Sequence, residues 1–194
     1  AGDTIATMVE LALAGDFVPF AVNVNATEAN ETIRPFLPLA ERLGSLFESL
    51  VGATPGVLEV CVEGDIAGYD TRIIELAVLK GFFGSISSDA VTYVNAPQLA
   101  KEHGLEVRDV TCAASPDYVN LLTIRGGGHS ISGTLSGPRA DQRVVNIDGI
   151  PFDVPPVENM VVITNDDRPG VIGTVGTLLG QADVNIADMD VSRA

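Results

Sequence analysis

Residues 105–154 alternate between short apolar segments and turns rich in glycine and aspartate. Short segments with β-branched or alternating apolar positions are typical of strands. The segments are Leu105–Cys112, Tyr118–Ile124, Ser130–Ser136, Arg143–Asp148 and Phe152–Val154. The turns between them include Gly126–Gly128, Gly137–Pro138 and Asp148–Gly149. Because tight turns of this composition join antiparallel neighbours, the stretch predicts an antiparallel meander.

Helical patterns precede the meander. Between Pro35 and Val51 the apolar residues recur on one face of a helix, and Gly52 supplies a stop signal. Asp70 or Thr71 is placed to cap a second helix. The other expected elements are strands at Val57–Glu63 and Val91–Val94 and a helix at Pro97–His103. We therefore predict one α+β domain over residues 25–156, in which helices cover the meander.

The first residues, 1–24, have a different pattern. Ile5 and Val9 share one face of a predicted helix that Gly15 ends, and an extended segment follows. A single amphipathic helix cannot bury its apolar face without a partner. We therefore expect residues 1–24 to be the end of an upstream domain and its linker, and we place a second linker near Pro155–Pro156.

The chain of 194 residues carries a formal net charge of −15. Such a surface repels nucleic-acid phosphates and anionic lipids, so neither nucleic acid nor membrane is an expected partner. No apolar run is long enough to span a membrane, and no signal-peptide pattern opens the sequence. Cys61 and Cys112 lie in apolar, strand-like segments, which favours reduced, buried thiols in a cytoplasmic protein over a disulfide or metal pair.

Side chains suited to catalysis are few in this sequence. His103 is expected at a helix C-terminus, where a partial positive charge is favourable, and His129 is expected in a solvated turn. The sequence has no Ser-His-Asp order, no Cys-x-x-Cys pair and no His-x-x-x-His pair. We therefore predict no catalytic residue and no metal site in this chain.

Arg139 and Arg143 lie close to the Gly137–Pro138 turn of this acidic chain. Two arginines near one turn are suited to clamping a phosphate or a carboxylate. The alternative is that both guanidinium groups are solvated at the surface. Arg139 and Arg143 are thus the candidate anion-binding residues.

Residues 157–194 read as a second structural unit. Met160–Thr164 is a short β-branched run, a helical pattern begins at Val171, and Val184–Val191 has the composition of a strand. Pro169 has a fixed backbone angle that suits the first residue of the helix. The predicted order is strand, loop, helix, strand.

Gly173, Gly176 and Gly180 recur through that predicted helix. A dinucleotide site needs Gly-x-Gly-x-x-Gly at a strand-to-helix turn, where the backbone approaches the pyrophosphate closely. Here the glycines run along the helix, so we expect no nucleotide to bind. A stripe without side chains favours close packing on a sheet or on a second chain.

The loop before the helix groups polar side chains at a helix N-terminus. Asn165 and Asp167 point the same way from alternate positions, and Asn185 begins the strand that returns beside them. A carboxylate suits an α-ammonium group, and free helix amides with an asparagine suit a carboxylate, so the group suits a zwitterion. The alternative is that Asp167 caps the helix and Asn185 makes a turn.

The strings from Asn165 to Gly173 (Asn-Asp-Asp-Arg-Pro-Gly-Val-Ile-Gly) and from Ala182 to Ala187 resemble the first half of an ACT domain, an amino-acid-sensing module with a ferredoxin-like fold. They are most similar to the C-terminal regulatory domain of the D-3-phosphoglycerate dehydrogenase family. The resemblance implies that L-serine binds as an effector between two such modules. The residues implied to bind it are Asn165, Asp167, Pro169, Gly170 and Asn185.

The middle of the chain resembles the intervening, allosteric substrate-binding domain of long-form members of that family. The motifs are Gly64–Gly68, Lys80–Gly84, Val94–Pro97, Gly133–Pro138 and Ile147–Gly149. In that family a basic cluster binds a phosphorylated effector, and Arg143 matches one of its positions. Ile150 and Pro155 stand where arginine is usual. We therefore expect a role as a spacer and oligomerisation element in preference to a role as a second effector site.

The start of the chain is similar to the junction between the catalytic and regulatory halves of actinobacterial-type members. By implication, the full-length enzyme oxidises 3-phosphoglycerate to 3-phosphohydroxypyruvate with NAD, in the cytoplasm and as a homo-oligomer, a dimer or a tetramer. The expected fragment lacks the catalytic domain, binds no cofactor and is inactive, and serine regulates it allosterically.

The alternative is an L-serine dehydratase subunit or a free-standing amino-acid-binding ACT protein. The intervening domain also resembles one found in iron–sulfur L-serine dehydratases. Two distant cysteines fall short of the three or four that such a cluster needs.

Overall fold

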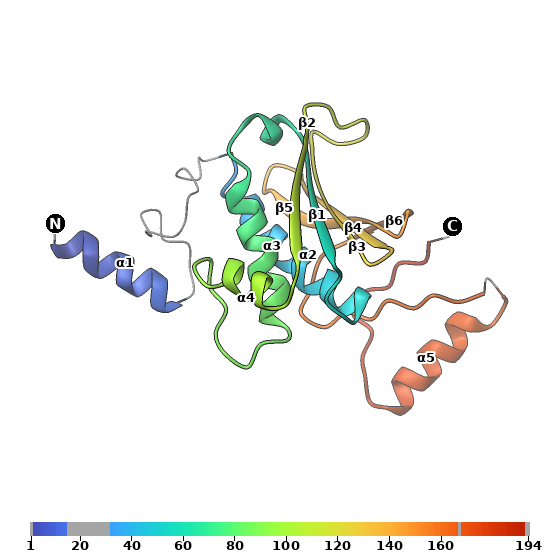
Figure 1. Ribbon diagram of the computed structural model, residues 1–194. Helices are drawn as coiled ribbons and strands as arrows, with labels where there is room; N and C mark the ends of the chain where they lie inside the picture. The colour runs from blue at the N-terminus through green and yellow to red at the C-terminus, as the bar shows by residue number, and fades with distance from the viewer. Residues whose placement is uncertain (1, 15–31, 167, 193–194) are drawn as a thin grey trace.

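The computed structural model describes residues 2–14, 32–166 and 168–192 (Figure 1). The first helix, α1 (Gly2–Ala14), forms as its pattern predicts. The extended segment that was expected after Gly15 lies outside the described residues. No helix in the described ranges is long and apolar enough to cross a membrane.

The chain folds around one sheet of six strands, which confirms the α+β class (Figure 1). The strands lie in the order β2-β1-β3-β4-β5-β6. Their bounds are β1 Val57–Gly64, β2 Glu106–Cys112, β3 Asn120–Gly126, β4 His129–Ser136, β5 Asp141–Ile147 and β6 Ile150–Val154. Strands β3 to β6 pair antiparallel with their neighbours, so the meander was predicted correctly for this part of the sheet.

Strand β2 differs from the prediction, because it does not belong to the meander. It pairs only with β1, and that pair is parallel. The chain between β1 and β2 contains a short 3-10 helix, η1 (Asp65–Gly68), and two α-helices, α3 (Arg72–Gly84) and α4 (Ala96–Glu102). A helical crossover of this kind returns the chain in its original direction, so the two strands become parallel.

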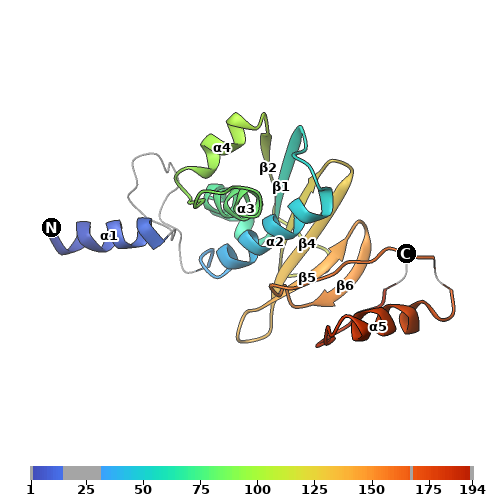
Figure 2. The ribbon, with the colours of Figure 1, turned by 90° about the horizontal axis from the view of Figure 1, so that it is seen from below.

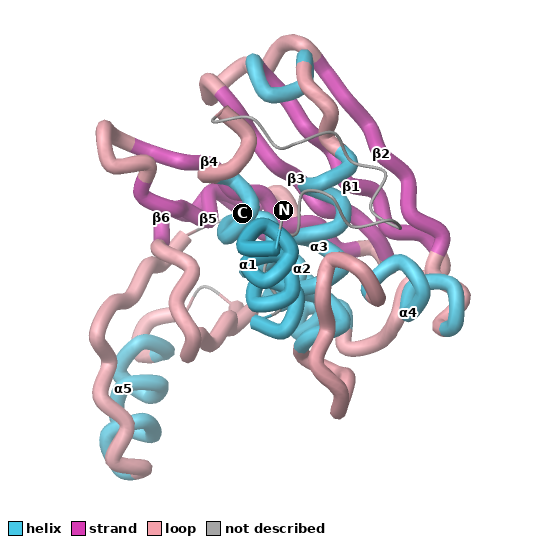
Figure 3. The backbone as a smooth tube through the Cα atoms, turned by 90° about the vertical axis from the view of Figure 1, so that its left-hand side faces the viewer, coloured by secondary structure: helices cyan, strands magenta, loops and turns pink. Residues whose placement is uncertain are grey.

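Three helices cover one face of the sheet, as expected. Figures 2 and 3 show α3, α4 and α2 (Phe36–Val51) on the same side of the strands. The core between helices and sheet includes Leu39, Leu43 and Phe47 of α2, each with no exposed surface. Gly52 ends α2 in the left-handed conformation, and its N–H donates to the carbonyl of Glu48.

Helices α2 and α3 cross with their backbones in direct contact. A Cβ atom built on Gly81 would lie 1.8 Å from the carbonyl oxygen of Glu41, and one on Gly44 would lie 2.1 Å from that of Val78. A Cβ atom built on a third glycine, Gly133 of β4, would lie 2.9 Å from the carbonyl oxygen of Arg143, and 3.0 and 3.1 Å from the side chains of Leu43 and Leu39 of α2. Glycine is therefore required wherever α2 touches its neighbours most closely.

The strand predicted at Val91–Val94 is wrong, because this segment is a turn that leads into α4. The side-chain oxygen of Asn95 accepts from the backbone N–H of Thr92 at 2.7 Å, and the N–H of Ala96 donates to the carbonyl of Thr92. These bonds satisfy the backbone locally, so the segment has no need of a neighbouring strand.

The C-terminal unit agrees with the prediction only in its helix, α5 (Val171–Gln181), where Gly173, Gly176 and Gly180 all lie. The strands predicted at Met160–Thr164 and Val184–Val191 are wrong, since both segments are irregular and mostly exposed. A strand needs a hydrogen-bonded neighbour, and within the described residues neither segment pairs with one.

Pro169 was expected to be the first residue of the C-terminal helix, but it lies before α5. Gly170 precedes the helix as its N-cap, with φ at 96°. This left-handed conformation separates the proline from the helix and suits glycine, which has no Cβ.

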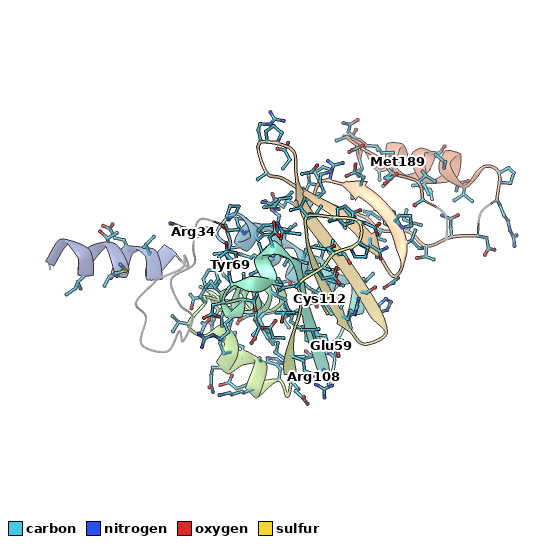
Figure 4. All side chains as sticks on the ribbon, turned by 90° about the horizontal axis from the view of Figure 1, so that it is seen from above. Arg34, Glu59, Tyr69, Arg108, Cys112 and Met189 are labelled. Carbon is cyan, nitrogen blue, oxygen red and sulfur yellow. The ribbon has the colours of Figure 1, made fainter. Side chains whose placement is uncertain are left out.

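The two cysteines are both free, but only Cys61 is buried. Burial raises the pKa of the Cys61 thiol, which makes it less reactive at neutral pH. Cys112 was predicted to be buried and is exposed, because it ends the edge strand β2 (Figure 4).

We predict that Gly81→Ala destabilises the domain, because the added methyl group has to push the α2 backbone away. Overpacking of this kind typically costs about 1–3 kcal/mol, so the free energy of unfolding in urea should fall by at least that range. Gly84→Ala is the matched control, since nothing lies within 4 Å of its added Cβ. Equal stability of the two variants would contradict the close crossing.

Candidate anion site and effector loop

An open depression of about 570 Å³ lies where α2 meets the β4–β5 hairpin and the end of β6. We call it the arginine depression. It is lined by Arg42, Arg139, Ala140, Asp141, Gln142, Arg143, Pro155 and Pro156. Three arginines thus line one hollow in a chain of net charge −15, which makes the hollow a local exception to the acidic surface.

Two of the three arginines are already paired with carboxylates of the chain. Arg143 donates from Nε to Asp153 Oδ1 at 2.6 Å and from Nη2 to the Asp153 carbonyl. Arg139, whose side chain is 83% exposed, contacts Asp141 at 3.4 Å, a weak pair. Within the described ranges, no carboxylate lies within ion-pair distance of Arg42. Its charge is the one most available to an anion.

Gln142 adds a polar group to the wall of this depression. Its side-chain oxygen is buried and accepts no hydrogen bond within the described part of the chain. A buried acceptor without a donor costs about 1–3 kcal/mol. Because this oxygen has almost no exposed surface, a ligand in the depression reaches it only if the Gln142 side chain moves.

The structure brings together both arginines that the sequence singled out, Arg139 and Arg143. Sequence reasoning missed Arg42, which lies on a helix far earlier in the chain and reaches the hairpin only through packing of α2 on the sheet. Pro155 lines the depression and Ile150 begins β6, so neither supplies a cation there. That Arg139 and Arg143 bind an anion stays a prediction.

The residues expected to bind an amino acid lie around the start of α5. Asn165, Pro169, Gly170 and Asn185 are all exposed, and Asp167 lies outside the described residues. Within the described residues, no hydrogen bond joins Asn165 to Asn185. The amides of the first helical turn have no partner inside the helix and remain suited to a carboxylate. The effector role of these residues stays a prediction.

The histidines have structural roles in the described residues. His129 was expected to be solvated, but its Nδ1 lies 2.8 Å from Asp148 Oδ2, and Asp148 also accepts from the N–H of Ser130. The pair therefore ties two hairpin turns together. The ring of His103 lies against Phe83, with centroids 5.3 Å apart. In the described ranges, no group of three His, Cys, Asp or Glu side chains could hold a metal ion.

Two acidic side chains lie near one another between α3 and β2. Burial raises the pKa of the Glu75 carboxyl, and the negative charge of Asp109 raises it further. Thr71 donates from Oγ1 to Asp109 at 2.7 Å, so Asp109 is held in place beside the helix start. The folded state therefore favours the protonated form of Glu75.

A family model described as the D-3-phosphoglycerate dehydrogenase intervening domain matches residues 32–148. The matched range contains α2 to α4, strands β1 to β5 and most of the residues that line the arginine depression, so the fold is that of an intervening domain. The chain belongs to the D-3-phosphoglycerate dehydrogenase family.

Curated relatives extend the likeness beyond the matched domain. The chain is 42% identical over 198 aligned residues to D-3-phosphoglycerate dehydrogenase of Mycobacterium leprae, covering all of this chain and 38% of the relative. The chain is 37% identical to the Synechocystis enzyme, over 89% of this chain and 32% of the relative. It is 32% identical to the Bacillus subtilis enzyme, over 89% of this chain and 34% of the relative. The chain thus spans between 32% and 38% of the length of these relatives.

We predict that Glu75→Gln stabilises the chain at pH 7. A carboxyl whose pKa is raised by folding contributes stability at low pH, and this stability is lost as pH rises from 4.5, its ordinary value, through the raised folded value. The variant should melt about 2–4 °C higher at pH 7, the equivalent of about 1 kcal/mol, with a smaller difference at pH 4. Calorimetry at both pH values tests this, with exposed Glu158→Gln as control; a gain that does not depend on pH would refute it.

Proposed function

We propose that this chain is the regulatory and oligomerisation region of an NAD-dependent D-3-phosphoglycerate dehydrogenase. The observation that carries the proposal is the match to the intervening domain, together with 42% identity along the whole chain to such an enzyme. The whole protein would oxidise 3-phosphoglycerate to 3-phosphohydroxypyruvate in L-serine biosynthesis, in the cytoplasm and as a dimer or tetramer. The relatives' names favour this reading over a serine dehydratase subunit or a free-standing ACT protein.

The described residues do not fit NAD. Gly173, Gly176 and Gly180 lie inside α5, so they do not form the turn that holds a pyrophosphate. No group in the described ranges assembles a catalytic histidine or a nucleophile with a base. Hydride transfer therefore belongs to another part of the whole protein, and this region by itself is inactive.

L-Serine is the effector that we assign to the start of α5. The first-turn amides of α5 would take its carboxylate, and Asn165, Asp167 and Asn185 would take its ammonium and hydroxyl groups, with Pro169 and Gly170 shaping the loop. Binding between two such modules would favour one arrangement of subunits. A coupling free energy of about 1–3 kcal/mol is enough to change activity several-fold.

A second function, anion binding in the arginine depression, is favoured by its three arginines, of which Arg42 has no carboxylate within ion-pair distance in the described part of the chain. The ligand class is a small phosphorylated or carboxylated molecule. Arg42 and Arg139 would supply most of the charge, because Arg143 is bound more closely to its carboxylate.

For the effector site, we predict that the chain binds L-serine and that Asp167→Ala abolishes the binding. Asn185→Ala should weaken it with little change in melting temperature, because Asn185 is exposed. Titration calorimetry with L-serine, and with D-serine and glycine as controls, measures both effects. Normal serine affinity in a folded Asp167→Ala variant would remove this residue from the site.

For the arginine depression, we predict that Arg42→Gln lowers the affinity for inorganic phosphate at least tenfold. A charge-assisted hydrogen bond contributes about 1.5–3 kcal/mol, and tenfold corresponds to about 1.4 kcal/mol. Arg34→Gln removes the same charge from an exposed position outside the depression (Figure 4) and should bind phosphate nearly as the wild type does. Equal losses in both variants would point to nonspecific charge effects.

A further inference from the structure

The carboxylate of Asp153 forms an ion pair with Arg143, one of the arginines that line the arginine depression. Arg143 Nε and Nη2 donate to the carboxylate and to the carbonyl of the same aspartate, so the Nε/Nη2 edge of the guanidinium group is engaged. The Arg143 side chain is 27% exposed, whereas that of Asp153 is 76% exposed. The aspartate is therefore the partner that solvent and an incoming anion reach more easily, and the anion has to displace it.

The same aspartate is held from its other side by the C-terminal segment. The backbone N–H of Asp153 donates to Asp190 Oδ2 at 3.2 Å. A second contact lies two residues later in the segment and two residues earlier in β6, where Ser192 Oγ donates to the carbonyl of Pro151. Because the contacts are two residues apart in β6 and in the C-terminal segment, the segment follows the outer edge of β6 in the antiparallel direction, through side-chain bonds.

These contacts form one continuous chain of bonds from Asp190 through Asp153 to Arg143. Strand β6 is short, and Pro155 and Pro156 directly after it line the arginine depression. Whatever moves the end of β6 therefore moves both the carboxylate that blocks Arg143 and part of the wall of the depression.

We propose that Asp153 is an internal competitor for anions in the arginine depression and that the C-terminal segment controls it through Asp190 and Ser192. With the segment bound to the edge of β6, Asp153 stays on Arg143 and the depression binds anions weakly. When the segment leaves, Asp153 is free to turn away, and Arg143 joins Arg42 and Arg139. The proposal rests on the anion site proposed above, and it links that site to the part of the chain that carries the effector loop.

The test measures the affinity of the 194-residue chain for inorganic phosphate. Asp153→Asn should raise the affinity about tenfold, because it removes the competing charge, and Asp190→Asn should raise it about threefold or more. Asp188→Asn is the matched control. It removes the same charge from the same segment, but within the described residues its carboxylate contacts only the neighbouring Met189 amide. It should change affinity by less than a factor of two.

Hydrogen exchange gives a second measurement that nonspecific charge effects would not move. Since linkage is reciprocal, saturating phosphate should release the segment and speed exchange at the Asp153 amide, while the Ile131 amide in the centre of the sheet stays protected. Ser192→Ala should speed exchange at Asp153 without phosphate.

The outcomes separate the two proposals. If neither the wild type nor any variant binds phosphate, the anion site itself is wrong. If the wild type binds it and Asp190→Asn behaves like Asp188→Asn, the site stands and the control by the C-terminal segment is refuted. The same conclusion follows if phosphate leaves exchange at the Asp153 amide unchanged.

Discussion

The close packing of α2 against α3 and β4 is the constraint on which the rest of this structure depends. The helix lies against α3 at Gly44 and Gly81 and against β4 at Gly133, and at each place a Cβ would meet another group at 3.0 Å or less. Close contact on two sides fixes both the position and the rotation of α2. Its buried face then supplies Leu39, Leu43 and Phe47 to the core. Its exposed face carries Arg42 to the hairpin that bears Arg139 and Arg143. The candidate site is thus a consequence of helix packing.

Electrostatics explains why a cluster of arginines is tolerated there. Arg139 and Arg143 each have a carboxylate partner nearby on the same hairpin or the next strand, so little repulsion remains among the three cations. In a chain with a net charge of −15 the surroundings are attractive to cations as well. The same balance lowers the net attraction for an anion, and salt screens these exposed pairs within about 8–10 Å. Release of one carboxylate therefore matters more here than it would on a basic surface.

Local sequence signals predicted the elements whose hydrogen bonds close locally. Helix α2 with its Gly52 stop, α4 before Gly104 and the hairpins of β3 to β6 all depend on residues that are near one another in the chain. The parallel pairing of β2 was missed because it depends on a crossover of two helices. The turn at Thr92–Asn95 was read as a strand because Val91 and Val94 are β-branched, although the Asn95 side chain decides its shape. Arg42 was missed because no local pattern reports which distant residues a helix will approach.

The two edges of the sheet are poorly suited to pairing with a strand of a partner chain. Strand β2 is exposed along one edge, but its outer positions carry the ion pair of Glu106 and Arg108, and such charges discourage pairing with another strand. At the other edge, β6 contains Pro151, and the C-terminal segment already occupies two of its backbone groups. Helix α5 is different, since none of its residues is buried and Ile172 and Leu178 are 55% and 61% exposed. Burial of apolar area contributes about 25 cal/mol per Å², so the exposed apolar side chains of α5 have more to gain from burial than either sheet edge has.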